Sequence, residues 1–472
     1  MSPTGPTAAA GAAAPPPTAS TAAPGAGATK SARGIPTSVP APATAATGAT
    51  TPWSAPARKL PGLGRQALPG IFDSTPGRMN ALRWLTIVMS FLFALAGASA
   101  LYTTANATTR ADTNADQVVR IQGIYSDLLR ADSDATNAFL VSGLENPTQR
   151  ADYESAMARV TSAISAAAST QPADADALAL LNTAIQRYAA DVESARAYNR
   201  QGMPVGSQYL KQASASLRTT ALPLLDNLRV ANVERTTGEF SAARMTAPFH
   251  AIGLLTLLVF VAVGVWLAQR THRYLNTGLT AAAAVVLAAY LVGTGVLMSA
   301  GSTLGDAEMY TFRQTTALAS IRSAAFDIRA NESLGLIARG QAAPYEARAQ
   351  ARIKEIGTAI DTSLSYTLDT PIKKAATDYF QAHADIRKLD DNGAWDQAVS
   401  EATNPARAAG RTFAALDAAT AKPLADTQAR LSQQTLAPRT SLVVAALAVL
   451  IGGIAASGLT ARGIAKRLEE YR

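Results

Sequence analysis

The chain has 472 residues, of which 16% are charged and 48% are hydrophobic, and its formal net charge is +8. The charged fraction is well below the roughly 25% typical of soluble domains. Cysteine is absent, which excludes disulfides, thiolate zinc sites, iron–sulfur clusters and thiol catalysis. The chain has three histidines, so imidazole-based hydrolytic or metal chemistry has few residues to draw on.

The N-terminal stretch predicts a disordered tail. Residues 1–57 consist mainly of Ala, Pro, Thr, Gly and Ser, which bury too little apolar surface to offset the entropy of ordering the chain. The stretch lacks the apolar core of a signal peptide. We therefore expect 1–78 to be a disordered cytoplasmic tail, with Met1 and Met79 both open as the true start.

Four apolar stretches are each close to the roughly 20 residues needed to cross a membrane. They contain no Asp, Glu, Lys or Arg and cover 84–103, 247–268, 279–298 and 440–460. A buried core helix rarely stays uncharged over such a length. The stretches predict four transmembrane helices, over 79–103, 247–268, 279–298 and 439–461.

Basic residues near the ends of these helices predict the orientation. The segment before the first helix, the loop 269–278 and the tail 462–472 are all positive, which places them and both termini in the cytoplasm of a multi-pass cell-membrane protein. The positive charge is thus a membrane signal, and nucleic-acid binding is disfavoured. The candidate contacts for lipid headgroups or a cytoplasmic partner are Arg270, Arg273, Arg462, Lys466 and Arg467.

The two long segments between the transmembrane helices, 104–246 and 299–438, are then extracytoplasmic. Both are rich in helix formers, and apolar residues recur every three or four positions, as in Leu178, Leu181 and Ile185. Helix breaks are predicted near 143–147, 170–174 and 202–206. Each segment predicts an up-down four-helix bundle whose first and last helices continue into the membrane.

The second half of the chain repeats landmarks of the first. The stretch 134–143 aligns with 331–340, and the stretch 221–226 aligns with 421–426, at offsets of 197 and 200 residues. Because the offset is nearly constant, we infer an internal duplication of one unit, transmembrane helix, bundle and transmembrane helix. The predicted fold class is an all-α membrane protein with duplicated bundles.

Two prolines lie where the fourth helix of each bundle enters the membrane. Pro248 and Pro438 each remove a backbone donor, which marks a helix boundary or allows a kink. The boundary is the simpler interpretation. The functional alternative is a hinge at which a shift of the bundle becomes a tilt or piston movement of the transmembrane helix.

The sequence predicts no catalytic, cofactor or metal site, and we expect a protein that is not an enzyme. It lacks GxxxxGK[ST], HExxH and GxSxG motifs. A solvated helix face is favoured over a cation site for Asp132, Asp134 and Glu145, and His383 is not expected to pair with Asp385. Surface charges or intrahelical pairs are favoured over carboxylate-binding groups for Arg120, Arg130, Arg322 and Arg329.

The Ala/Arg-rich composition, the Pro/Ala/Thr-rich tail and the duplicated four-helix transmembrane plan resemble the actinobacterial GlnX family of membrane sensors. The bundles also resemble the sensing domains of chemoreceptors. The GlnX resemblance covers 79–472 as architecture. It implies an extracytoplasmic solute-binding lipoprotein (GlnH) and a cytoplasmic Ser/Thr kinase (PknG) as partners, and a role in relaying amino-acid availability inward.

These observations together predict a non-enzymatic transmembrane signal transducer. The lipid bilayer is its environment, and a homo-oligomer is compatible with the plan. The alternative is a structural envelope protein or a transporter accessory subunit that relays nothing. A coupled transporter is disfavoured because the apolar stretches carry no ionisable residue.

Overall fold

A computed structural model describes residues 75–141, 146–271 and 276–469, all of which belong to one compact unit, residues 67–472. Of the predicted disordered tail, residues 1–74 lie outside the described residues, as Arg273 does. Residues 75–78 begin the first helix, so the prediction of disorder is wrong for them. Within those residues the secondary structure is helical throughout, as predicted, and no strand occurs. Four stretches are long and apolar enough to cross a membrane, Gly77–Leu140, Val205–Thr271, Thr277–Ile337 and Trp395–Lys466, which supports a multi-pass membrane protein.

The described residues of the first half of the chain form six α-helices. They are α1 (Thr75–Leu140), α2 (Pro147–Thr170), α3 (Ala175–Arg200), α4 (Val205–Ser216), α5 (Leu222–Ala243) and α6 (Ala247–Thr271). The predicted breaks are confirmed. Asn146 caps α2 by accepting a hydrogen bond from the Thr148 amide, with Pro147 at the first helical position. Gly202, at φ +67°, supplies the left-handed residue after α3.

The second half also forms six α-helices in the described residues. They are α7 (Thr277–Asp306), α8 (Arg313–Ile337), α9 (Ala343–Ser363), α10 (Tyr366–Asp391), α11 (Trp395–Thr403) and α12 (Ala408–Glu469). Gly340 and Gly393, both at positive φ, follow α8 and α10. Two π-helical segments, η2 (Leu217–Ala221) and η3 (Ala307–Phe312), join α4 to α5 and α7 to α8 without interrupting the helical path.

The prediction that every outer helix continues into a transmembrane helix is wrong at one place. Residues Arg244–Thr246 separate α5 from α6, whereas α1 and α12 run unbroken over 66 and 62 residues. Arg244 turns away from the helix and forms an ion pair with Glu308 of η3 at 2.6 Å. Some apolar segments are therefore joined to the helical groups by a continuous helix, whereas α6 is joined to α5 by a short non-helical segment.

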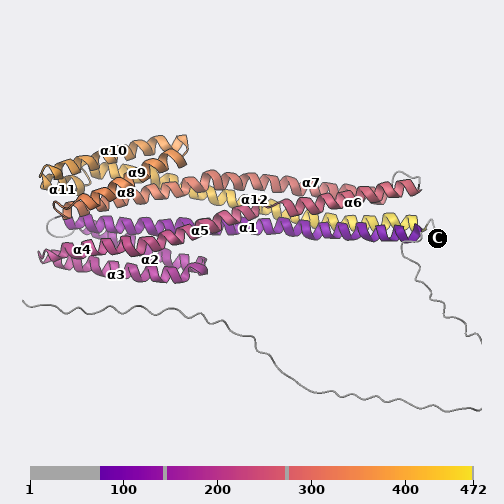
Figure 1. The fold of residues 1–472 in the computed structure, drawn as a ribbon, viewed down its shortest axis with the longest axis horizontal. Coiled ribbons are helices and arrows are strands. Elements are labelled where there is room, and N and C mark those ends of the chain that lie inside the picture. The colour runs from indigo at the N-terminus through magenta and orange to yellow at the C-terminus, as the bar shows by residue number, and fades with distance from the viewer. Residues whose placement is uncertain (1–74, 142–145, 272–275, 470–472) are drawn as a thin grey trace, which may run out of the picture. The chain divides into compact units, whose positions relative to one another are not determined.

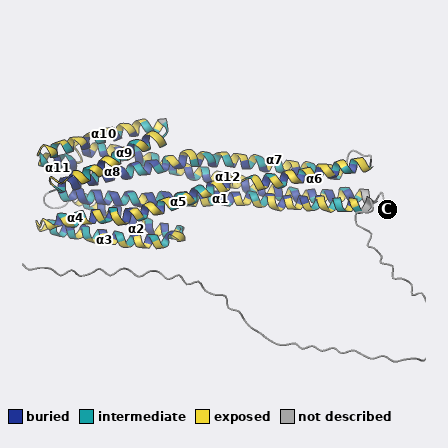
Figure 2. Cartoon of the chain, in the orientation of Figure 1, coloured by how far each residue is buried: buried dark blue, intermediate teal, exposed yellow. Residues whose placement is uncertain are grey.

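The helices gather into an apolar region and two helical groups (Figure 1). In the apolar region α1, α6, α7 and α12 pack around Phe93, Phe249 and Val449. Large apolar side chains on their outer faces, such as Leu258 and Val261, are about two-thirds exposed, as lipid-facing residues are (Figure 2). The first helical group contains the end of α1 with α2–α5, and the second contains α8–α11 with the start of α12.

The two helical groups share one hydrophobic core. It joins Leu128, Tyr188 and Leu225 of the first group to Ile328 and Tyr379 of the second. The helices α1 and α8 meet along this core, where the hydroxyls of Ser126 and Ser323 lie 2.7 Å apart. The groups therefore form one packed body. Polar side chains buried along their contact cost free energy unless they are hydrogen-bonded or paired with an opposite charge.

Candidate functional site: a polar cavity between the helical groups

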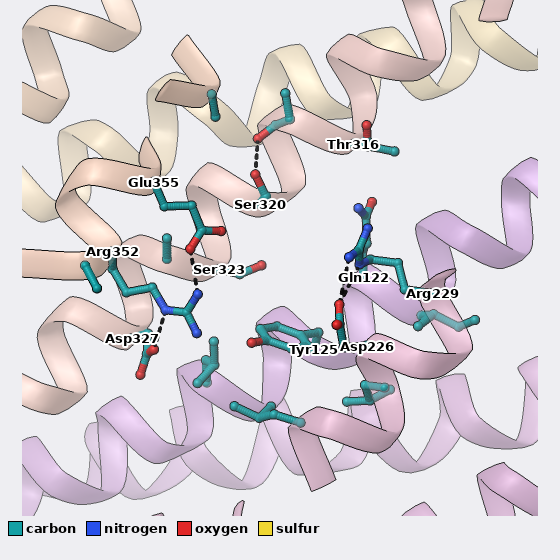
Figure 3. Close-up of a pocket in the computed structure, with 18 of the residues that line it drawn as sticks. Gln122, Tyr125, Asp226, Arg229, Thr316, Ser320, Ser323, Asp327, Arg352 and Glu355 are labelled. Atoms are coloured by element: carbon teal, nitrogen blue, oxygen red, sulfur yellow. Dashed lines mark hydrogen bonds and ion pairs between the residues drawn. The ribbon is translucent and has the colours of Figure 1, made fainter. Parts of the chain in front are cut away.

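A cavity of about 840 Å³ lies where the two helical groups meet (Figure 3). The helices α1 and α5, with η2, line it from the first group, and α8 and α9 line it from the second. Its size falls within the range of pockets that hold small molecules. Every wall is helical, so a change in the spacing of the groups changes the cavity.

Arg218 connects the two groups at the edge of this cavity. Its guanidinium donates to Asp132 of α1 at 2.7 Å and to Asp327 of α8 at 2.6 Å. Arg218 lies in η2, and the wider π-helical turn there belongs to a class of irregularity common at functional sites. One side chain of the first group thus bridges a carboxylate of its own group and a carboxylate of the other.

The bridge extends into the second group through Arg352 on α9. Arg352 donates to the second oxygen of Asp327 at 2.9 Å and to Glu355 at 2.6 Å (Figure 3). Asp132 is fully buried and also accepts a hydrogen bond from Ser214 at 2.8 Å. Both carboxylates are thereby held by charge-assisted hydrogen bonds, which are about twice as strong as neutral ones.

Arg218 and Asp327 of this network hold each other in their charged forms. Burial acts to raise the pKa of Asp327, but Arg218 and Arg352 outweigh it and lower that pKa below its ordinary value. Burial likewise acts to lower the pKa of Arg218, and Asp132 and Asp327 raise it instead. Since breaking a buried pair leaves an uncompensated charge, the bridge fixes how the two groups pack.

Other polar groups at the cavity lack partners. The side-chain oxygen of Gln122, a residue 6% exposed, and Nε of Arg218 are buried without a hydrogen bond among the described residues. The exposed guanidiniums of Arg313 and Arg348 form no ion pair within the described part of the chain. Buried polar atoms are nearly always satisfied, so the cavity has hydrogen-bonding capacity left for another molecule.

The two candidate hinge prolines occupy different environments. Pro248 is exposed at the second position of α6, directly after the break at Arg244–Thr246. Pro438 is buried inside the unbroken helix α12, which contains a second internal proline, Pro423. The boundary interpretation is therefore confirmed for Pro248 and wrong for Pro438, which lies where a kink would have to bend a continuous helix.

The candidate cytoplasmic contacts lie at helix ends. Arg270 is exposed in the last turn of α6, and Arg462 and Lys466 are exposed near the end of α12. Arg467 belongs to α12, and its side chain lies outside the described residues, as Arg273 does altogether. Asn276 joins the start of α7 to this end of α12 by donating to the Gly463 carbonyl at 3.1 Å.

The four arginines considered as carboxylate-binding groups do not line the cavity. Arg120 bonds Gln117 and Thr170. The guanidinium of Arg130 lies over Phe326, and that of Arg329 lies over Phe413. Arg322 pairs with Asp417 of α12 at 2.5 Å, so an intrahelical pair is wrong for this residue.

The acidic residues also differ from expectation. The solvated-face interpretation is wrong for Asp132, which is buried in the Arg218 bridge, and Glu145 lies outside the described residues. Asp134 is half-buried, and burial raises its pKa to about 6 against the opposing effects of Arg329 and Arg130. No group of three or more acids or histidines among the described residues could hold a metal ion.

Sequence reasoning about His383 missed its partners. The buried ring lies 2.7 Å from Glu332 through Nδ1 and 3.2 Å from Glu346 through Nε2. Burial acts to lower the pKa of His383, but the bonds to the two glutamates raise it to about 9. A protonated histidine therefore joins α10 to α8 and α9 at neutral pH.

The cavity residues themselves were not singled out from the sequence. A signal existed for Arg218 and Asp132, because each lies directly beside apolar core positions of its helix, Leu217 and Ala131. No periodic pattern marks Arg313 or Arg348, which are exposed on their helices. Their proximity depends on the packing of the two groups, which a pattern within one helix does not contain.

Comparison with known families places a sensor domain on this architecture. A family model described as the actinobacterial sensor domain matches residues 106–241. The match supports an actinobacterial sensor protein. No curated protein and no solved structure matches the chain. The sensor domain contains Asp132, Gln122 and Arg218, so it supplies one wall of the cavity and the bridging arginine.

Proposed function

We propose that the protein is a non-enzymatic transmembrane signal transducer. The two helical groups face outward and respond to a small ligand or to a solute-binding lipoprotein. The response passes through the apolar helices to a cytoplasmic partner such as a Ser/Thr kinase, and it reports amino-acid availability. The sensor domain at 106–241 supports a sensing role.

The observation that carries this proposal is the continuity of α1. One unbroken helix contains the apolar stretch 84–103 and the cavity residues Gln122 and Tyr125. About 20 residues separate the two regions, a rise of about 30 Å. A shift of α1 at the cavity therefore moves its apolar stretch directly, without a flexible joint.

The four apolar helices are joined to the helical groups in different ways, and we expect them to transmit a shift differently. The helix α12 is unbroken like α1, and η3 joins α7 to α8. Only α5 and α6 are separated, at Arg244–Thr246, within the described residues. We infer that a shift of the helical groups moves α1 and α12 but leaves α6 in place. The distance between the cytoplasmic ends of α6 and α12 would then change.

An internal duplication fits the contact between the groups. Ser126 and Ser323 are separated by 197 residues, the same offset as between the landmarks Gly143 and Gly340. When two copies of a unit pack about an approximate two-fold axis, equivalent residues of the copies contact each other at that axis. One chain would then contain the paired arrangement that a symmetric receptor obtains by dimerising.

The orientation follows the basic helix ends. Arg270, Arg462 and Lys466 are exposed at the ends of α6 and α12 and would face the cytoplasm, with both termini. They offer a cationic surface to anionic lipid or to an acidic partner. A kinase that reads the position of α12 relative to α6 would contact this surface.

The test uses two prolines of one helix. Cells of the native host are shifted between amino-acid-rich and amino-acid-poor medium, and Ser/Thr phosphorylation of cytoplasmic proteins is measured. The variant Pro438→Ala restores a backbone donor in α12 beside its apolar stretch and is expected to change the phosphorylation response at normal abundance. Pro423→Ala, in the same helix but in the second helical group, is the matched control and is expected to leave the response unchanged.

A structural or transporter-accessory role makes a different prediction. Deletion of the gene would then leave the phosphorylation response intact, and Pro438→Ala would behave as Pro423→Ala does. Either result at normal protein abundance contradicts the transducer. Pro248→Ala is expected to have a smaller effect than Pro438→Ala, because Pro248 already lies at a helix boundary.

A further inference from the structure

We propose that the cavity between the helical groups binds a small dicarboxylate that carries a hydroxyl or amino donor, such as a hydroxy- or amino-dicarboxylic acid. This inference rests on the proposed sensing role and names the chemistry of its ligand. It would make the chain itself a receptor for a small molecule, in addition to any protein it contacts.

The charge of the cavity selects an anion. Five arginines and three acids line it, so the lining carries a net charge of +2. Three of the arginines are neutralised by the three lining acids: Arg218 and Arg352 by Asp327 and Glu355, and Arg229 by Asp226 at 2.7 Å. The uncompensated charge therefore belongs to Arg313 on α8 and Arg348 on α9.

The geometry of the guanidinium selects a carboxylate. Its planar fork of donors matches the two oxygens of a carboxylate and forms paired hydrogen bonds. Two guanidiniums that form no ion pair among the described residues, those of Arg313 and Arg348, match two carboxylates. The guanidinium of Arg348 also lies 5.7 Å from the centre of the Tyr345 ring. The Tyr125 hydroxyl on α1 adds a donor for a further oxygen (Figure 3). The hydroxyls of Thr316 and Ser320 on α8 donate to the carbonyls of Arg313 and Ala317, so they offer acceptors.

The unsatisfied side-chain oxygen of Gln122 favours a ligand that can donate a hydrogen bond. This oxygen is buried in the α1 wall of the cavity and accepts no hydrogen bond within the described residues. Leaving a buried acceptor unsatisfied costs free energy. A ligand hydroxyl or amino group would satisfy it, whereas a plain dicarboxylate would not.

Occupancy would also tighten the contact between the groups. Arg313 and Arg348 belong to the second group, and Gln122 belongs to α1 of the first. A ligand held by both therefore favours one spacing of the groups over another, which is the differential affinity that a ligand-driven shift requires. The unbroken helix α1 carries that spacing toward the membrane.

The test is isothermal titration calorimetry on the full chain in lipid nanodiscs, in a chloride buffer free of carboxylates. L-malate and L-aspartate are expected to bind, succinate to bind more weakly, and neutral L-glutamine and inorganic phosphate to give no heat. Arg348→Gln and Arg313→Gln are each expected to weaken L-malate binding by about 10-fold or more. Arg187→Gln changes an exposed arginine of α3 away from the cavity and is the matched control.

A second variant tests the donor. Gln122→Leu is expected to reduce L-malate binding to the level of succinate while leaving succinate binding unchanged. Failure of both L-malate and L-aspartate to bind, or binding that Arg348→Gln and Arg187→Gln affect equally, overturns the inference. Binding of phosphate without any dicarboxylate also overturns it.

The outcomes separate this inference from the proposed function. If no dicarboxylate binds but Pro438→Ala still alters phosphorylation while Pro423→Ala does not, the ligand class is wrong and the transducer stands. If L-malate binds but neither proline variant nor gene deletion changes phosphorylation, the binding site stands and the transducer is wrong.

Discussion

The apolar region and the contact between the helical groups hold helices together by different means. In the apolar region glycines allow close approach, as at Gly453, where an added Cβ would lie 2.5 Å from the Cβ of Ala94. Between the helical groups, buried charges meet instead, as at Arg218 with Asp132 and Asp327. Close packing of small residues allows little relative movement of the helices, and a polar ligand does not alter it. An ion pair, by contrast, can be rearranged by an added anion. The comparison teaches that the sensing contact and the transmitting contact need different chemistry.

Removal of Arg218 is expected to have the largest effect. Arg218→Ala leaves Asp132 buried without its cation and should destabilise the fold by about 3–5 kcal/mol. Helical circular dichroism during thermal unfolding in detergent measures the loss. The control Arg159→Ala removes a more exposed pair with Asp127 and should cost about 0–1 kcal/mol. Equal losses for the two variants would show that the bridge is not special.

The pH dependence of stability tests the second helical group. The pKa of His383 is raised to about 9 from an ordinary 6.5, so its stabilisation is complete below pH 6.5 and is lost as pH rises through 9. The loss should be about 3 kcal/mol, the equivalent of about 2.5 pKa units. In His383→Gln the free energy of unfolding should no longer fall between pH 6.5 and 9. If it falls as steeply as in the wild type, His383 is not the titrating group.

The lower limit of this window comes from Glu346. Hydrogen bonding to His383 is the main cause that lowers the pKa of Glu346 to about 2 from an ordinary 4.5. Its stabilisation is therefore present above pH 4.5 and is lost as pH falls through 2. Stability from the cluster should be greatest between about pH 4.5 and 6.5, which the same unfolding series measures.

A smaller effect is expected in the apolar region. Gly453→Ala places a methyl group against Ala94 and the Ser90 carbonyl and should cost about 1–3 kcal/mol. Gly458→Ala in the same helix meets no atom within 4 Å and should leave thermal unfolding unchanged. If both variants unfold alike, close packing of α12 on α1 is not what holds the apolar helices.

The last effect concerns Asp134, where we expect a gain in stability, not a loss. Burial raises its pKa to about 6 from an ordinary 3.8, so ionisation costs stability as pH rises through this range. Asp134→Asn should therefore raise stability above pH 6 by up to about 3 kcal/mol, the equivalent of about two pKa units. At pH 4 the variant and the wild type should unfold alike, and a gain that is the same at both pH values would contradict the cause.

Much of the fold could be predicted because its signals are local. Uncharged apolar stretches, the cap at Asn146–Pro147 and Gly202 each act on the few residues around them. The break at Arg244–Thr246 also has a local signal, since Pro248 favours a helix boundary just before it. The ion pair between Arg244 and Glu308 was missed because it joins distant parts of the chain. The cavity was missed for the same reason, since Arg218 acquires its role only when Asp327 is packed beside it.

The most direct test of an outward-facing receiver uses the absence of native cysteine. Single cysteines replace exposed residues of the helical groups (Arg187→Cys, Lys388→Cys) and of the helix ends (Arg270→Cys, Lys466→Cys). A membrane-impermeant maleimide is added to cells that are intact or permeabilised. The account predicts labelling of the first pair in intact cells and of the second pair only after permeabilisation. Labelling of Arg270→Cys in intact cells, with Arg187→Cys protected, would contradict it.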